Sequence, residues 1–285
     1  MTREFLSPLR YPGGKGKMAD VFKQIVEANA ILDGTYVEPF VGGGSVALSL
    51  LLNDYVSRIV INDKDRSIYA FWHSVVNQTE RLCRMIADTP VDMDMWRRQK
   101  AVQATKEEAG LLELGFSTFF LNRTNRSGII KGGVIGGNNQ AGNYLIYARF
   151  NKPDLIARIE RIADYADRIE LHNEDAVALL HGINDTMPDR TLYYLDPPYY
   201  EKGPGLYMNY FNDDDHRKIA AAVASISHGK WVVTYDNHPF IAALYSRYRQ
   251  KEFSLKYSTT NGKKGKEIMI FSDNLLEVEP FNCDR

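Results

Sequence analysis

Apolar residues in the first part of the chain alternate between the spacing of a helix and that of a strand. In residues 17–30 they recur three and four positions apart, which predicts an amphipathic helix. Residues 35–41 form a short β-rich run, residues 45–53 return to helical spacing, and residues 57–63 form an apolar run that ends on an acid. This order of strands and helices predicts a parallel sheet with helices packed on it.

The same alternation returns in the second half of the chain. It predicts helices at residues 153–167 and 214–226 and strands at residues 168–173, 191–195 and 230–237. Residues 252–273 contain β-rich runs on either side of a loop rich in Gly and Lys, which predicts a closing hairpin. We therefore expect an α/β fold, a doubly wound parallel sheet that ends in an antiparallel hairpin.

The pattern changes between these halves. Residues from 76 to about 115 are polar with helical spacing, and residues 116–144 are dense in Gly, Asn and Arg. That composition is typical of exposed loops rather than of a packed core. We therefore predict that residues 76–151 form an inserted, mostly helical domain, and that residues 1–75 and 152–285 together form the α/β domain.

Composition and charge narrow the class of protein. The chain has 285 residues, 44% of them hydrophobic, which is enough for a large core. Its net charge of −1 means that an anionic partner would need a local basic face. The two cysteines, Cys83 and Cys283, lack zinc-ligand spacing, which predicts no metal and favours a reducing, cytoplasmic location. The sequence shows no apolar signal core and no run of about 18 apolar residues, so no membrane span is predicted.

Polar or conformationally special residues follow three of the predicted strands. They are the segment Glu38-Pro39-Phe40, Asp63 and Asp196. Parallel, doubly wound sheets bind their ligands beyond the carboxyl ends of the strands. The sequence therefore predicts that these residues line a cofactor cleft.

A glycine-rich turn, "EPFVGGGSVAL", lies between the first predicted strand and a helix. Glycines at such a place let a ligand approach the backbone, although a tight turn alone would also explain them. Asp63 ends the next strand, where a carboxylate can accept hydrogen bonds from ribose hydroxyls. The alternative is that it caps the following helix, a role that Asp65 or Asn62 could fill equally well.

The stretch "LYYLDPPYY" ends a buried strand on an acid, prolines and tyrosines. Pro197 and Pro198 have fixed φ and no N–H, so the turn is stiff and its carbonyls can accept hydrogen bonds. Asp196, the Pro197 carbonyl and the ring of Tyr199 together offer two acceptors and a stacking face. This set fits a planar amino group, such as the exocyclic amine of a base. The alternative is a strand-end turn whose tyrosines pack in the core.

The ordered motifs resemble those of the DNA adenine-N6 methyltransferases. "DPPY" with an upstream "EPFVGGG" is similar to that family, and "RYPGGK", Asp63 and the position of the insertion are similar to its Dam-like D12 branch. The resemblance covers nearly the whole chain. It implies a Rossmann-like methyltransferase sheet with an inserted target-recognition domain, and transfer of a methyl group from S-adenosylmethionine to adenine in double-stranded DNA.

The resemblance also implies roles for single residues, matched by motif. Asp196, Pro197, Pro198 and Tyr199 would be catalytic. The cofactor would be bound by Tyr11, Lys15, Phe40, Gly42, Gly44, Asp63, Asp175 and Asp196, although "HNED" around Asp175 could be a simple helix cap. Asn122 and Arg123, in a segment similar to the family's "LNR…G", together with Arg126, Lys131, Asn138 and Asn143, would contact DNA.

Other functions remain compatible with parts of this pattern. Cytosine N4, RNA adenine or a protein glutamine could be the acceptor, but the cytosine and glutamine enzymes more often carry Ser or Asn where this chain has Asp196. A catalytically silent DNA-binding homologue would have less need of Asp63, Asp196 and Tyr199. A nicotinamide-dependent oxidoreductase would share the sheet, yet it would leave "DPPY" unexplained. The loop at residues 261–267 either touches phosphate or keeps an edge hairpin soluble.

Overall fold

The computed structural model describes residues 5–10, 18–201, 211–256 and 264–278 of the chain. The strands are β1 (Gly34–Glu38), β2 (Val56–Asn62), β3 (Ile169–His172), β4 (Thr191–Leu195), β5 (Lys230–Asp236), β6 (Arg249–Lys256) and β7 (Lys264–Phe271). The α-helices are α1 (Ala19–Ala28), α2 (Ser45–Leu51), α3 (Arg66–Asn77), α4 (Thr79–Asp88), α5 (Met93–Ala104), α6 (Leu111–Thr124), α7 (Lys152–Ala163), α8 (Ala176–Ile183), α10 (Asp213–Ala224) and α11 (Pro239–Leu244). The short 3₁₀ helices are η2 (Arg126–Gly128), η3 (Ile146–Arg149) and η4 (Ala166–Arg168).

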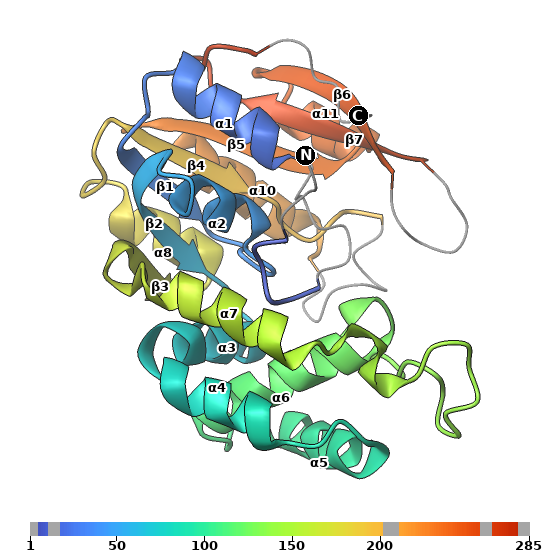
Figure 1. The fold of residues 1–285 in the computed structure, drawn as a ribbon. Coiled ribbons are helices and arrows are strands. Elements are labelled where there is room, and N and C mark those ends of the chain that lie inside the picture. Colours follow the sequence, from blue (N-terminus) through green and yellow to red (C-terminus); the bar gives the residue numbers. More distant parts are fainter. Residues whose placement is uncertain (1–4, 11–17, 202–210, 257–263, 279–285) are drawn as a thin grey trace.

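The strands form one seven-stranded sheet in the order β3-β2-β1-β4-β5-β7-β6 (Figure 1). Neighbours from β3 to β5 are parallel, whereas β7 runs antiparallel to both β5 and β6. The prediction of a doubly wound α/β sheet with a terminal antiparallel hairpin is therefore confirmed. The chain reverses its direction of winding between β1 and β4, and a ligand crevice is expected outside the carboxyl ends of those strands.

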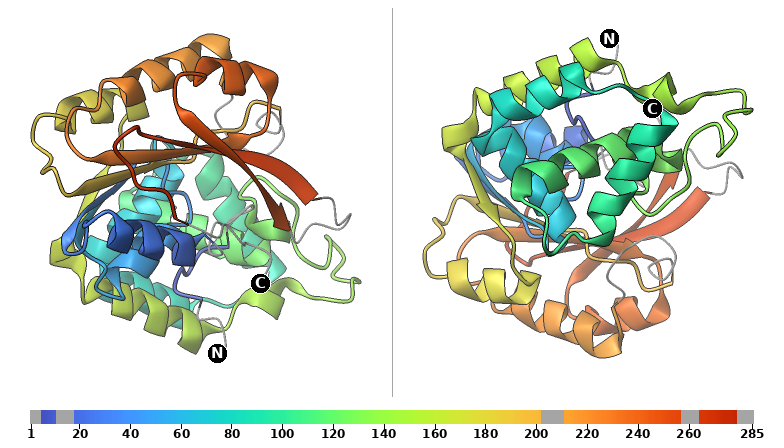
Figure 2. Two further views of the ribbon diagram at one scale, coloured as in Figure 1. Left: turned by 90° about the horizontal axis from the view of Figure 1, so that it is seen from above. Right: turned by 90° about the horizontal axis from the view of Figure 1, so that it is seen from below.

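Helices cover both faces of the sheet. Helices α1, α2, α3 and α7 lie over one face, and α8, α10 and α11 lie over the other (Figures 1 and 2). Successive residues of β4 show the division, because Leu192 and Tyr194 join the apolar cluster of the first face while Tyr193 and Leu195 join that of the second. Burial on both sides explains why this strand is apolar throughout.

The segment between β2 and β3 contributes four α-helices beyond α3, namely α4, α5, α6 and α7. The expectation that residues 116–144 are exposed loop was wrong for residues 116–124, which belong to α6. Phe116, Phe119 and Phe120 have helical spacing and are buried in the cluster of the first face, with Leu82 and Ile86 of α4. The glycines and asparagines that follow made this part of the segment look more polar than it is. The division of the chain at residues 76–151 stays a prediction.

No helix within the described residues combines the length and the apolar character that crossing a membrane requires.

Candidate active site

The ends of β1 and β4 bring acidic side chains together at the point where the winding reverses. Glu38 is the last residue of β1 and is 5% exposed, and Asp196 directly follows β4. Burial raises the pKa of Glu38 well above its usual range, and the negative charge of Asp196 raises it further. The two motifs that the sequence analysis singled out are thus electrostatic neighbours in the fold.

The glycine turn after β1 is held by the end of β2 and by helix α3. The N–H of Gly42 donates to Asp63 Oδ2 at 3.1 Å, and the Nε1–H of Trp72 donates to the Gly42 carbonyl at 3.0 Å. Gly44 has a φ of +60°, and a Cβ there would lie 2.9 Å from the Trp72 ring. A glycine is required at this place because a side chain would be strained and would also clash.

Trp72 was not among the predicted site residues, since within "RSIYAFW" it looks like an ordinary apolar core position. Replacing it by phenylalanine is expected to weaken binding of the predicted cofactor, S-adenosylmethionine, by about 5- to 10-fold, because the buried Gly42 carbonyl loses its donor. Calorimetry measures this affinity. Trp96→Phe is the matched control, because the Nε1–H of Trp96 on α5 donates to Asn125 Oδ1 at 2.7 Å and not to the glycine turn. Equal affinities in both variants would contradict the role of Trp72.

Asp63 faces the glycine turn rather than capping a helix. Its Oδ1 accepts from the N–H of Asp65 at 2.9 Å, and Asp65 itself caps α3 by accepting from Ser67 N at 3.0 Å. Burial raises the pKa of Asp63 to about 7. Asp65, and not Asp63, is therefore the cap of α3. The carboxyl group of Asp63 lies beside the turn that the cofactor would approach.

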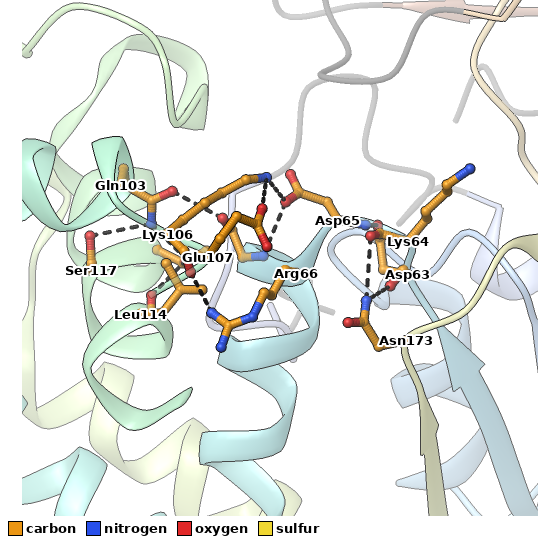
Figure 3. Close-up of polar contacts among 12 residues, drawn as sticks. Asp63, Lys64, Asp65, Arg66, Gln103, Lys106, Glu107, Leu114, Ser117 and Asn173 are labelled. Atoms are coloured by element: carbon orange, nitrogen blue, oxygen red, sulfur yellow. Dashed lines mark hydrogen bonds and ion pairs between the residues drawn. The ribbon is translucent and has the colours of Figure 1, made fainter. Parts of the chain in front are cut away.

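The loop after β2 is fastened to the helices of the segment between β2 and β3. Lys106 Nζ lies 3.0 Å from Asp65 Oδ1, in an ion pair that is mostly shielded from solvent (Figure 3). Arg66 donates to the carbonyls of Lys106 and Ala109, and the side chain of Asn173 donates to the Asp63 carbonyl (Figure 3). These contacts connect the loop that carries Asp63 to the segment between β2 and β3 and to the loop after β3.

Asp175 is a helix cap, which is the alternative role that the sequence analysis allowed for it. It caps α8 by accepting from Val177 N at 3.0 Å, and it forms an ion pair with Lys64 at 3.0 Å. Although partial burial opposes ionisation, hydrogen bonds from Lys64 and Val177 lower the pKa of Asp175. A contact with a cofactor remains a prediction for this residue, as it does for Phe40, whose ring lies 6.2 Å from that of Phe211.

The "DPPY" turn is tied to strand β5. Asp196 Oδ1 accepts from Thr234 Oγ1 at 2.7 Å, and the Thr234 hydroxyl also pairs with the Tyr194 hydroxyl at 3.0 Å. Pro197 and Pro198 are buried. The orientation of the Asp196 carboxylate is thus fixed by a side chain from the neighbouring strand.

Tyr199 and Tyr200 have different surroundings. Tyr199 is 6% exposed, belongs to the apolar cluster of the second face, and donates its hydroxyl to Glu267 Oε2 at 2.8 Å. Tyr200 is half-buried and stacks on the rings of His238 and Phe240, with centroids 4.2 and 5.0 Å away. Stacking of Tyr199 on a substrate stays a prediction.

Comparisons with known proteins identify the family of the chain. The family model for D12 class N6 adenine-specific DNA methyltransferases matches residues 11–260. The chain belongs to this family. It is also 23% identical, over 235 residues, to the Type II methyltransferase M.MjaIII of Methanocaldococcus jannaschii, covering 74% of this chain and 77% of that protein.

Solved structures with a similar course of the chain share little sequence with it. The rRNA methyltransferase aviRa from Streptomyces viridochromogenes has a TM-score of 0.40 and 12% identity, covering 92% of this chain and 88% of its own. Protein LPL1258 from Legionella pneumophila has a TM-score of 0.33 and 13% identity, and the match covers 95% of this chain and 90% of that protein.

The D12 methyltransferase carries a cluster of arginines where α6 and α7 approach the N-terminal segment. Arg123 donates to the carbonyls of Arg149 and Pro8, and Arg158 donates to the Ser7 carbonyl. Burial lowers the pKa of Arg123 to about 10, and the charges of Arg10 and Arg158 lower it further. Cations crowded in this way would be stabilised by an anion.

The other residues predicted to bind DNA divide into a buried one and exposed ones. Asn122 is 1% exposed, and its amide bonds the N–H and carbonyl of Arg10 and the Gly128 carbonyl, so its place in the structure is a support for the N-terminal segment. The exposed positions are Arg126, Lys131, Asn138 and Asn143. A direct DNA contact by Asn122 stays a prediction.

A small surface pocket lies in the same part of the methyltransferase. Its volume is about 260 Å³, and it is lined by Arg126, Ile135, Gly136, Gly142, Asn143 and Tyr144. Gln140 holds the surrounding loop, because its amide donates to the carbonyls of Ile135 and Gly137 and accepts from Ile146 N. A segment rich in Gly and Asn is thus given a defined shape by one side chain.

Some predicted site residues cannot be placed. Tyr11, Lys15 and residues 261–263 of the glycine- and lysine-rich loop lie outside the described residues. Among the residues that are described, no group of His, Cys, Asp and Glu side chains is arranged to hold a metal ion.

Proposed function

We propose that this methyltransferase transfers a methyl group from S-adenosylmethionine to the exocyclic amine of an adenine that is flipped out of duplex DNA. The observation that carries the proposal is the meeting, at one edge of the sheet, of the Asp63-bound glycine turn and the Thr234-bound Asp196 turn. Family membership supports DNA methylation.

The residues around the first turn fit the proposed cofactor. A carboxylate has about four lone-pair positions, and Asp63 uses one on each oxygen for the amides of Gly42 and Asp65. The remaining positions can accept the ribose hydroxyls, while Gly42 and Gly44 present backbone without side chains. When bound, S-adenosylmethionine supplies an electrophilic methyl group on a sulfonium.

The residues of the second turn suit an amine as the methyl acceptor. Thr234 fixes Asp196 Oδ1, which leaves the carboxylate turned so that it can accept one N–H of the adenine amine. The Pro197 carbonyl accepts the other, and this draws the nitrogen lone pair out of conjugation with the ring. Catalysis then consists of positioning and electrostatics, and the proton leaves to water after transfer.

Partly buried and exposed basic residues together offer DNA a place to bind. The arginine cluster and Arg126 and Lys131 would neutralise phosphates, while the amides of Asn138 and Asn143 can read base edges. Extrusion of the adenine costs a few kcal/mol, which these contacts would offset.

The proposal is tested by incubating the purified chain with labelled S-adenosylmethionine and a panel of DNA and RNA duplexes and single strands. Single-molecule sequencing of DNA from a host that expresses the chain then maps modified bases to their context. We expect N6-methyladenine in a fixed sequence context of duplex DNA. Labelled cytosine or labelled RNA would instead identify another acceptor, and cofactor binding without transfer would identify a silent homologue.

Replacing Tyr199 by alanine is expected to weaken capture of the flipped adenine by about 1–3 kcal/mol, because a stacking face is lost. Phenylalanine keeps that face and should be milder. The measurement is kcat/KM for DNA in a labelled-methyl assay. Equal losses in the two variants would show that the hydroxyl group, and not the ring, carries the function.

A further inference from the structure

Two buried carboxylates lie next to each other behind the "DPPY" turn. Asp236 ends β5, Glu267 lies on β7, and the two residues are direct partners in the antiparallel pairing of these strands. Side chains of directly opposed residues emerge on the same face of a sheet, with Cβ atoms about 4.5–5.5 Å apart. Asp236 is 4% exposed and Glu267 is 0% exposed.

Both carboxylates are bonded to the segment that immediately follows Pro198. Asp236 accepts from the backbone N–H groups of Tyr200, at 2.9 Å, and Glu201, at 2.8 Å, using one oxygen for each. Glu267 Oε2 accepts from the hydroxyl of Tyr199 at 2.8 Å. Three successive residues of the turn are therefore held by two neighbouring acids.

This arrangement is costly if it serves the hairpin alone. Like charges opposed on one face of a sheet repel each other, and buried carboxylates need hydrogen-bond donors. Among the described residues, the hydroxyl of Tyr199 and the backbone N–H groups of Tyr200 and Glu201 donate to these acids, so the acids stabilise the turn after β4 as well as the strands that carry them. A leucine pair would suit the hairpin better.

We propose that Asp236 and Glu267 form a clamp that positions the Asp196–Tyr199 turn for methyl transfer. The inference rests on the proposed function and adds positioning residues to it. Asp236 fixes the direction in which the chain leaves Pro198, and hence the Pro197 carbonyl and Asp196 before it. Glu267 fixes the rotation of the Tyr199 ring. Neither acid touches the reacting atoms.

The sequence gives no local sign of this clamp. Asp236 precedes "NHPF" and Glu267 lies in the lysine-rich hairpin, so each looks like a solvated acid. Only the register of β5 against β7 places them side by side.

The first test is a double-mutant cycle. Tyr199→Phe and Glu267→Gln are each expected to lower kcat for DNA methylation by about 3- to 10-fold, with the Kd for S-adenosylmethionine unchanged. The double variant should be no slower than the worse single variant, because the two changes break the same bond. Losses that multiply, or single variants with the wild-type kcat, would overturn the role of Glu267.

The second test concerns Asp236. Asp236→Asn keeps one acceptor but turns an NH₂ group toward a backbone N–H, and kcat is expected to fall by about 10- to 100-fold. Glu252→Gln is the matched control, an acid-to-amide change at an exposed position on β6, and should stay within about twofold of the wild type. A wild-type kcat in Asp236→Asn would refute the clamp.

A readout independent of activity separates this inference from the proposed function. Hydrogen exchange at the amides of Tyr200 and Glu201 should be at least about 10-fold faster in Asp236→Asn than in the wild type or in Glu252→Gln. If wild-type protein methylates no nucleic acid, the proposed function fails, and this exchange result still decides whether the acid holds the turn. Unchanged exchange would contradict the clamp whatever the substrate.

Discussion

Replacing Asp196 by alanine is expected to lower the rate of methyl transfer by about 100- to 1,000-fold or more, close to the background of the assay. The carboxylate accepts an N–H of the target amine in the proposed complex, and loss of one such preorganised group typically has this effect. The variant also leaves the hydroxyl of Thr234 without the acceptor that it has at 2.7 Å.

Single-turnover transfer of a labelled methyl group, with enzyme in excess over DNA, measures this step apart from product release. Asp167→Ala is a suitable control, since Asp167 is exposed in η4 on the chain segment before β3. Thermal unfolding should show that the Asp196→Ala variant keeps its fold. A folded variant that transfers methyl groups at the wild-type rate would remove Asp196 from the mechanism.

Thr234 shows why the active site was only partly predictable from the sequence. The "DPPY" motif indicated Asp196 as a candidate because an acid, prolines and an aromatic residue are adjacent in the chain. The residue that orients this acid is 38 positions away and is recognisable only from the pairing of β4 with β5. Trp72 was missed for the same reason, because its contact with Gly42 depends on how α3 packs under the turn.

The fold itself was largely predictable. The central strands β1, β4 and β5 coincide with apolar runs bounded by turn residues, since strands buried on both faces need such runs. The hairpin differs, because β6 begins with polar residues and β7 begins at Lys264, within the stretch at residues 261–267 that was expected to be a loop. The failure at residues 116–124 has a local cause. The helix α6 ends at Thr124, and the glycine-rich stretch that follows diluted its apolar spacing in any window that spans both.

The pairs of acids at the strand ends suggest how the site is kept rigid before any substrate binds. Burial and the neighbouring charge of Asp196 raise the pKa of Glu38, while Asp236 adjoins Glu267 and both accept hydrogen bonds from the turn. A turn held from behind in this way loses little conformational entropy when the substrate arrives, and preorganisation of this kind favours catalysis.

Asp63 is expected to make both the stability of the protein and its affinity for S-adenosylmethionine depend on pH. Its pKa is raised by burial from 3.8 to about 7. Between about pH 4 and pH 7 the unfolded chain carries the charged form while the folded chain binds a proton, so the free energy of unfolding falls as the pH rises through this window. Above pH 7 the loss is complete.

Replacing Asp63 by asparagine removes this dependence of the free energy of unfolding on pH. The free energy of unfolding at pH 8 should rise by about 2–4 kcal/mol relative to the wild type, and the difference should disappear toward pH 4. Part of the gain is offset because an amide oxygen can accept from Gly42 or from Asp65 but not from both as the carboxylate does. Urea unfolding followed at a series of pH values measures the difference.

Cofactor affinity should change in the opposite direction. The ionised carboxylate is the better acceptor for ribose hydroxyls, so the Kd for S-adenosylmethionine should rise by up to about 10-fold for each pH unit below 7, with release of one proton on binding. Lys106→Met should move this midpoint upward, because the charge of Lys106 lowers the pKa of Asp63. Asp63→Asn should bind weakly with no such dependence, and a variant that kept the wild-type pH profile would assign the titration to another group.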